Sequence, residues 1–123
     1  MENIKNSYAK TIMIILLAVI IGFTGSVSVA SAGTLTATNG NRKFNSDWQA
    51  SETKGDAKIT YGFNKTLIDE DYVWAKHSKS SHYASIYQAY NQKWYNSSSV
   101  TKGKTAKLEI KHKGSTIKYR CSW

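Results

Sequence analysis

The sequence predicts an all-β protein, a small antiparallel β-sandwich of roughly six to eight strands that follows a cleaved N-terminal signal peptide. Apolar and polar residues alternate strictly over Thr105–His112 and again over Thr116–Trp123, which is the two-residue period of a half-buried strand. Turn dipeptides such as Asn39-Gly40 interrupt the chain at short intervals. After residue 32 no segment shows the 3.6-residue period of an amphipathic helix.

Residues 1–32 have the order of segments found in a secretory signal peptide. The basic lead Met1–Lys10 is followed by the almost entirely apolar run Thr11–Phe23, and then by the small residues Ala30-Ser31-Ala32 that a signal peptidase recognises. The apolar run is shorter than the roughly 20 residues that a membrane-spanning helix needs. The sequence therefore predicts cleavage directly after the small residues and one secreted, extracellular domain over residues 33–123.

The predicted mature domain is small, cationic and poor in cysteine. Two of the 17 Lys and Arg residues and one of the 8 Asp and Glu residues precede residue 33, so the domain has a formal charge of +8. Its single cysteine, Cys121, cannot form an internal disulfide, and stability must come from packing. A buried free thiol and a disulfide-linked homodimer are the two alternatives for Cys121. The many aromatic residues, including four tryptophans, are expected to supply much of the core.

The excess of positive charge on an exported protein indicates an anionic partner outside the cell. We expect an anionic cell-envelope ligand, such as lipid II or phospholipid headgroups. Nucleic acid is a poor candidate because the protein is exported. Solubility alone is the simpler explanation of the charge.

The first half of the domain reads as short strands separated by polar turns. Thr34–Thr38 is rich in β-branched residues, and Ala57–Phe63 places apolar residues at every second position. Arg42–Lys54 fits a loop, a weak strand or one helical turn. The acidic run Asp69-Glu70-Asp71 predicts a solvated loop before a short strand at Tyr72–Ala75.

The second half contains the clearest strands. His82–Asn91 carries apolar or aromatic residues on both faces, which predicts a central strand, and Trp94-Tyr95 extends it or begins the next one. Thr105–His112 and Thr116–Trp123 are separated by the turn signal Lys113-Gly114-Ser115. We therefore expect these last two strands to pair as an antiparallel hairpin.

Histidine, cysteine and acidic residues give only weak indications of a metal or catalytic site. His77 and His82 are five residues apart, but a zinc site needs three or four ligands. His112 and Cys121 share a predicted inward face and are the candidate thiol–imidazole pair of a small hydrolase. An inward cysteine is more often a core residue, and the acidic run lacks the spacing of a calcium loop. We therefore expect no catalytic residue, cofactor or metal.

Cations near the C-terminus form the most coherent candidate for a binding surface. Lys107 and Lys111 point outward from one predicted strand, and Lys118 and Arg120 point outward from the next. If the two strands pair, the four side chains form one basic sheet face that can meet phosphates. Exposed tyrosine or tryptophan beside them would suit a membrane interface. The alternative is a solvated strand face without a ligand.

The segment His77–Ile86 (HSKSSHYASI) resembles the lactococcin 972 family of bacteriocins. The pattern of that family is histidine, four residues, histidine, any residue, a small residue, Ser or Thr, and Val or Ile. Ala106–Ile110 is similar to the family's penultimate strand, and Tyr119–Trp123 is similar to its closing aromatic strand with a terminal tryptophan. The resemblance covers about Trp74–Trp123.

This resemblance implies a secreted β-sandwich bacteriocin that binds the cell-wall precursor lipid II and blocks septum formation in related bacteria. The family offers no catalytic residue to transfer, so the matched positions His77, His82 and Trp123 are candidate ligand-binding residues. Together with the charge, it predicts a non-enzymatic, secreted, cationic antibacterial protein of Gram-positive bacteria that acts at the target cell envelope. The alternative is a secreted or surface-associated binding or immunity protein without killing activity.

Overall fold

The computed structural model describes residues 32–123, so the predicted signal peptide lies outside the described residues except for its last residue. Within this range the chain forms eight strands and contains no helix that is long and apolar enough to cross a membrane. The strands are β1 (Thr34–Thr38), β2 (Trp48–Lys54), β3 (Ala57–Asn64), β4 (Glu70–His77), β5 (Tyr83–Gln88), β6 (Lys93–Asn96), β7 (Thr105–Lys111) and β8 (Ile117–Ser122).

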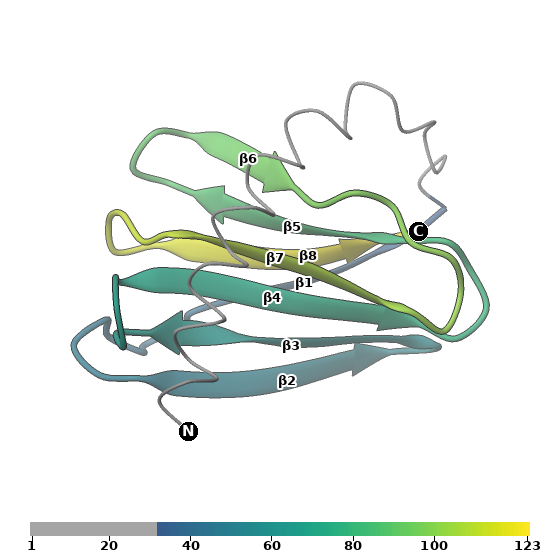
Figure 1. Cartoon of the computed structure of the whole chain (residues 1–123), viewed down its shortest axis with the longest axis horizontal. Helices are drawn as coiled ribbons and strands as arrows, with labels where there is room; N and C mark the ends of the chain where they lie inside the picture. Colours follow the sequence, from purple (N-terminus) through teal and green to yellow (C-terminus); the bar gives the residue numbers. More distant parts are fainter. Residues whose placement is uncertain (1–31) are drawn as a thin grey trace.

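The strands build two antiparallel four-stranded sheets that pack against each other, which confirms the predicted all-β sandwich. The first sheet has the strand order β1-β8-β5-β6, and the second has the order β2-β3-β4-β7. The strands of both sheets run along the long axis of the molecule (Figure 1), as in an aligned sandwich. The segment His82–Asn91 is predicted to be a central strand, and it contains β5, which lies between β8 and β6 inside its sheet. This prediction is confirmed.

The ambiguous segment Arg42–Lys54 contains an edge strand, β2, which pairs with β3 along its whole length. Lys54 and Ala57 are partners in this pairing, so the connection is a two-residue turn. Gly55 begins that turn with a φ of 58°, a conformation that glycine adopts without steric cost.

The predicted C-terminal hairpin is wrong, because β7 and β8 belong to different sheets. β7 pairs with β4, whereas β8 pairs with β1 and β5. The side chain of Asn39, after β1, holds the connection between them: its amide donates to the carbonyl of Ser115 (3.2 Å) and its oxygen accepts from the backbone N–H of Ile117 (3.0 Å). Alternation identifies the inward face of each strand, but it fits two strands that face each other across a core as well as two that pair.

The core between the sheets is mainly aliphatic. Ile, Leu, Val and Ala side chains from β3, β4, β5, β7 and β8 fill it, and only three aromatic residues are buried there: Tyr61, Phe63 and Tyr119. All four tryptophans are only partly buried. The expectation that aromatic rings supply much of the core is met only in part, because three rings are buried in it while Trp48 and Trp123 pack against it from partly buried positions.

The acidic run after residue 68 is not a solvated loop. Glu70 begins β4, and its side chain and that of Asp71 are buried. Asp71 accepts hydrogen bonds from Nδ1 of His112 on both of its oxygens (2.9 and 3.0 Å). That partner lies 41 residues away in the sequence, so local composition could not reveal that Asp71 is satisfied inside the protein.

Candidate functional site: the outer face of the first sheet

The structure divides the four predicted surface cations between opposite faces of the sandwich. Lys107 and Lys111 lie on β7 and point outward from the second sheet, whereas Lys118 and Arg120 lie on β8 and point outward from the first. The prediction of one basic face with four cations is therefore wrong. It depended on the hairpin that does not form.

Lys118 and Arg120 instead have aromatic and hydroxyl neighbours on their own sheet. Strand pairing places Lys118 between Thr38 and Tyr87, and β6 adds Trp94 as the partner of Tyr87. Arg120, one row further along the sheet, is flanked by short hydroxyl side chains in the same way. We call the outward side chains at the centre of this sheet the basic–aromatic face: Tyr83, Tyr87, Trp94, Lys118 and Arg120.

The aromatic rings hold the two cations at the surface. The guanidinium carbon of Arg120 lies 3.7 Å from the ring centroid of Trp94, and Nζ of Lys118 lies 5.2 Å from that of Tyr87. The two ring centroids are themselves 5.1 Å apart. Cation–π contacts of this kind orient a cation without neutralising its charge. Both cations therefore keep their charge available to a ligand.

Arg120 is partly desolvated and has no acidic neighbour within the described range. Burial lowers the pKa of its guanidinium, whereas the nearby Tyr83 raises it. The group still carries its full charge at neutral pH, because arginine does not lose its proton there. Its Nε is buried and finds no hydrogen-bond partner among residues 32–123. A buried donor without a partner is costly.

Charge is segregated between the two sheets. No acidic residue lies on β1, β5, β6 or β8. Every acidic residue of the described chain lies on a strand of the second sheet or on a loop next to one: Asp47, Glu52, Asp56, Asp69, Glu70, Asp71 and Glu109. The charged side chains on the strands of the first sheet are therefore all positive, although the domain as a whole has charges of both signs.

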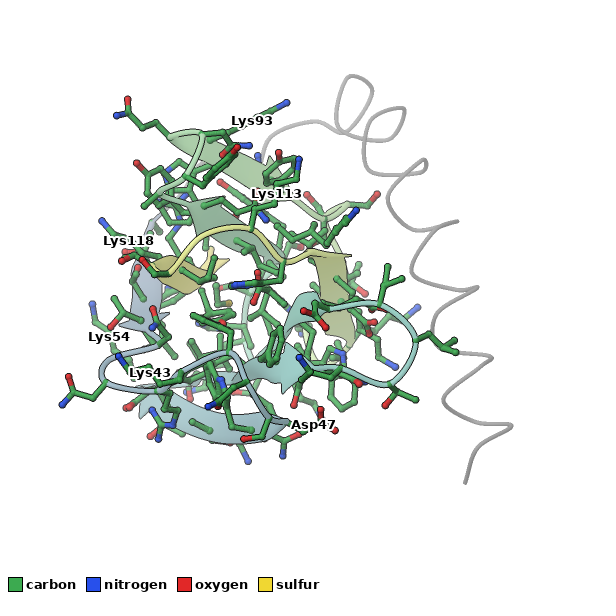
Figure 2. All side chains as sticks on the ribbon, turned by 90° about the vertical axis from the view of Figure 1, so that its left-hand side faces the viewer. Lys43, Asp47, Lys54, Lys93, Lys113 and Lys118 are labelled. Atoms are coloured by element: carbon green, nitrogen blue, oxygen red, sulfur yellow. The ribbon has the colours of Figure 1, made fainter. Side chains whose placement is uncertain are left out.

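More cations lie at one end of the first sheet (Figure 2). Lys93, at the start of β6, places Nζ 5.1 Å from the ring centroid of Tyr95. Lys113, in the β7–β8 loop, places Nζ 6.0 Å from the ring of Tyr90, which is 70% exposed. This end extends the same combination of cation and ring beyond the basic–aromatic face.

The two histidines of the family-like motif hold the crossover from β4 to β5. Both ring nitrogens of the fully buried His82 face backbone carbonyl oxygens, at 2.9 Å from Ser80 and at 3.2 and 2.8 Å from Ala75 and Lys104. Nδ1 of His77 accepts hydrogen bonds from the backbone N–H groups of residues 79 and 80 (3.1 and 2.9 Å). These contacts are internal to the fold and account for both side chains as structural residues.

Trp123 belongs to the same cluster. Its ring centroid lies 4.9 Å from that of His77, and its backbone exchanges two hydrogen bonds with Gly33 (2.7 and 2.9 Å). The indole covers Gly33 so closely that a Cβ there would lie 2.7 Å from the ring. The structure thus brings His77, His82 and Trp123 together, away from the basic–aromatic face.

The described residues offer no assembled metal or thiol site. Residues 32–123 contain no group of three or more His, Cys, Asp or Glu side chains that could hold a metal ion. His112 lies near one end of β8, because Gln88, the strand partner of Ile117, donates to the carbonyl of Lys111. Cys121 lies four residues beyond Ile117 on β8, about 13 Å from it along the strand, so the thiol and the imidazole do not meet. Burial raises the pKa of Cys121 to about 11, so the thiol is neutral. Nδ1 of His112 is hydrogen-bonded to the carboxylate of Asp71.

Sequence reasoning identified Lys118 and Arg120 but missed Tyr87 and Trp94 as their partners. The outward position of Tyr87 could be read from alternation, but Trp94 joins the face only because β6 pairs with β5.

Comparisons with protein-family models, with curated protein sequences and with solved structures found no match to this chain. Its function is therefore inferred from the site itself.

Proposed function

We propose that this is a secreted, non-enzymatic antibacterial protein, similar to the lactococcin 972 bacteriocins, that binds a phosphate-bearing ligand of the bacterial cell envelope through the basic–aromatic face. Lipid II and anionic phospholipid headgroups both carry such phosphate groups. The observation that carries the proposal is Arg120, a partly buried cation that stacks on Trp94 and has no acidic neighbour on its sheet.

The chemistry of the face suits a phosphate. Arginine offers a planar fork of donors that matches phosphate oxygens, and its charge strengthens those hydrogen bonds. Lys118 lies two residues away on the same strand face, about 7 Å from Arg120, so both can reach the oxygens of one diphosphate. Tyr87 and Trp94 have the amphipathic rings that favour a membrane interface.

Vesicle binding tests the proposed ligand. Purified protein is mixed with phosphatidylcholine vesicles that contain phosphatidylglycerol, lipid II or neither, and bound protein is measured after sedimentation. We expect binding to the two anionic compositions only, and weaker binding as salt is added. Arg120→Gln combined with Lys118→Gln should weaken binding about a hundredfold or more, since each of the two charged hydrogen bonds contributes roughly 1.5–3 kcal/mol.

The matched control removes the same charge from the opposite face. Lys58 and Lys76 are exposed on β3 and β4 of the second sheet, so Lys58→Gln combined with Lys76→Gln should bind like the parent. Equal losses in both double variants would mean that net charge alone drives binding, and the assignment of a face would be wrong.

Growth assays separate a toxin from an immunity protein. Added protein should inhibit Gram-positive bacteria related to its source, and the Arg120 and Lys118 double variant should not. If deletion of the gene instead makes its own host sensitive while added protein inhibits no strain, the antibacterial proposal fails and the immunity alternative stands.

A further inference from the structure

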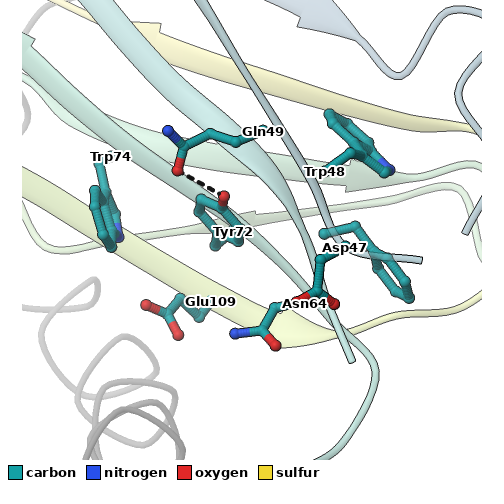
Figure 3. Close-up of a pocket in the computed structure, with 8 residues that line it drawn as sticks. Asp47, Trp48, Gln49, Asn64, Tyr72, Trp74 and Glu109 are labelled. Carbon is teal, nitrogen blue, oxygen red and sulfur yellow. Dashed lines mark hydrogen bonds between the residues drawn. The ribbon is translucent and has the colours of Figure 1, made fainter. Parts of the chain in front are cut away.

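The outer face of the second sheet contains a hollow of about 300 Å³ whose chemistry differs from that of the basic–aromatic face (Figure 3). Tyr72 and Trp74 of β4 contribute two aromatic rings, with centroids 5.6 Å apart. Gln49, Asn64 and Glu109 lie around them on β2, β3 and β7. The volume is at the lower end of the range for small-molecule sites, which suits one ring of a ligand.

Gly62 makes room for this hollow. It lies between Gln49 and Tyr72 in the strand pairing, and a Cβ there would collide with the carbonyl oxygen of Trp48 and lie 2.7 Å from the Tyr72 hydroxyl. Because glycine has no side chain, the Tyr72 ring can lie across β3, and its hydroxyl donates to Oε1 of Gln49 (2.9 Å). The aromatic surface is thus held in place by the sheet.

The polar groups around the rings are a mixture of donors and acceptors. Oε1 of Gln49 accepts from Tyr72, and Oδ1 of Asn64 accepts from the backbone N–H of Thr66 (2.7 Å), so both amides present NH₂ groups as donors. Oδ1 of Asp47 accepts from the N–H of residue 65 (2.8 Å), and its second oxygen remains as an acceptor. No single charge dominates the recognition.

Charged groups of both signs lie at the hollow. Asp47 and the 95% buried Glu109 line it, the similarly buried Glu70 lies beside Glu109, and Nζ of Lys107 lies 5.3 Å from the Trp74 ring, so neither a cation nor an anion is clearly favoured. A carboxyl group in such a site can accept a hydrogen bond from a hydroxyl group of a ligand. Burial, with the charge of Glu70, raises the pKa of Glu109 to about 7, so near neutral pH its carboxyl can also donate.

We propose that this hollow is a second binding site, specific for an uncharged sugar ring, on the face opposite the basic–aromatic face. The C–H groups of a pyranose pack on the Tyr72 and Trp74 rings, while its hydroxyl groups accept from the amides of Gln49 and Asn64. Aromatic walls with a few placed polar groups are the usual composition of a site that binds a small polar ligand. Both wall glycans and neutral polysaccharides carry this chemistry.

Titration of the purified protein with two sugars tests the site. Triacetylchitotriose carries the acetamido sugar of wall glycans, and maltotriose is a plain glucose oligomer; each is added while ¹H–¹⁵N spectra record the tryptophan indole N–H signals. We expect the Trp74 signal, identified by its loss in Trp74→Phe, to move with at least one sugar. A shift with triacetylchitotriose alone assigns an acetamido glycan, and one with maltotriose alone assigns a plain glucan.

Two variants connect the shift to the hollow. Gln49→Ala should weaken binding about tenfold, as expected for the loss of one or two hydrogen bonds. Ser51→Ala, two residues along the same face of β2 and outside the hollow, is the matched control and should bind like the parent. The proposal is overturned if neither sugar moves the Trp74 signal, or if Gln49→Ala binds as tightly as Ser51→Ala.

The two proposed sites can fail independently. The Arg120 and Lys118 double variant should retain sugar binding, and Gln49→Ala should retain binding to anionic vesicles. Loss of both activities in either variant would indicate general misfolding, which circular dichroism would reveal, and in a folded protein it would contradict two separate sites.

Discussion

The stability of the domain is predicted to fall as the pH rises from about 5 to about 8, because carboxyl groups on the second sheet hold protons in the folded state. Glu70 and Glu109 lie on the paired strands β4 and β7 and are 4% and 5% exposed. Burial raises the pKa of each carboxyl from 4.5 to about 7. For Glu109 the negative charge of Glu70 raises the pKa further, while the Trp74 indole opposes the rise.

The direction of the effect follows from proton counting. In the unfolded chain both carboxyls lose their protons near pH 4.5, whereas in the folded protein they keep them to about pH 7. Between these values the folded state binds more protons, so the free energy of unfolding decreases as the pH rises. A single carboxyl whose pKa rises from 4.5 to about 7 on folding changes the free energy of unfolding by about 3 kcal/mol over this pH range. Counting the interacting pair as one shared proton, we expect a loss of about 3 kcal/mol.

The buried ion pair on the inner face acts in the same direction. Burial alone would lower the pKa of His112, but the hydrogen bond and charge of Asp71 outweigh it and raise the pKa above 6.5. The stabilisation by protonated His112 is complete below pH 6.5 and is lost as the pH rises through the higher folded pKa. Burial also raises the pKa of Asp71 above 3.8, in spite of the opposing effect of His112.

Urea denaturation at several pH values between 5 and 8, followed by circular dichroism, measures this dependence. Glu70→Gln combined with Glu109→Gln removes both raised carboxyls and should make the profile flatter by about 3 kcal/mol, so that the double variant is more stable than the parent near pH 8. Glu52→Gln, on the exposed edge strand β2, removes a carboxylate of the same sheet and should keep the steep profile. A parent stability that is constant or rises between pH 5 and 8 would refute the reasoning, as would an equally steep profile for the double variant at Glu70 and Glu109.

Three further predictions concern buried groups. Gly62→Ala should lower the free energy of unfolding by about 2 kcal/mol in urea denaturation, because its Cβ collides with the backbone of Trp48; parental stability would contradict this. His82→Phe should cost about 3 kcal/mol, because three carbonyl oxygens lose their ring partner, whereas Lys79→Ala in the same crossover should be neutral in that assay. The Cys121 thiol should react with a thiol reagent only in denaturant and should leave the protein monomeric on non-reducing gels, since it is buried with a raised pKa; rapid reaction in native buffer would contradict this.

The fold class could be predicted because it depends on a local property of the sequence. Period-two alternation identifies strands and their inward faces, and the buried positions of β7 and β8 agree with it. The pairing of strands depends on the loops between them. The Asn39 side chain holds the β7–β8 loop from the other end of the chain, 78 residues from Ile117, and no pattern within residues 105–123 encodes that contact.

The site was only half predictable for the same reason. Lys118 and Arg120 point outward in any arrangement of β8, so their exposure follows from parity alone. Lys107 was assigned to their face through the assumed hairpin, and in the structure it instead places Nζ 5.3 Å from the Trp74 ring on the opposite sheet. Glu109 lies between Lys107 and Lys111 on the outward face of the same strand. Its burial beside Glu70 depends on the pairing of β7 with β4.

The absence of acidic residues from the first sheet also bears on how the two proposed sites are oriented relative to an anionic membrane. Residues 110–123 and 78–104 contain no acidic residue, and strands from both stretches meet in the first sheet. An anionic surface is therefore attracted to that sheet, where no carboxylate opposes it. In a two-layer sandwich the outer faces point in opposite directions. A protein held on a membrane by Arg120 would thus present the hollow at Trp74 away from the lipid, on the side where the glycan of a Gram-positive wall lies.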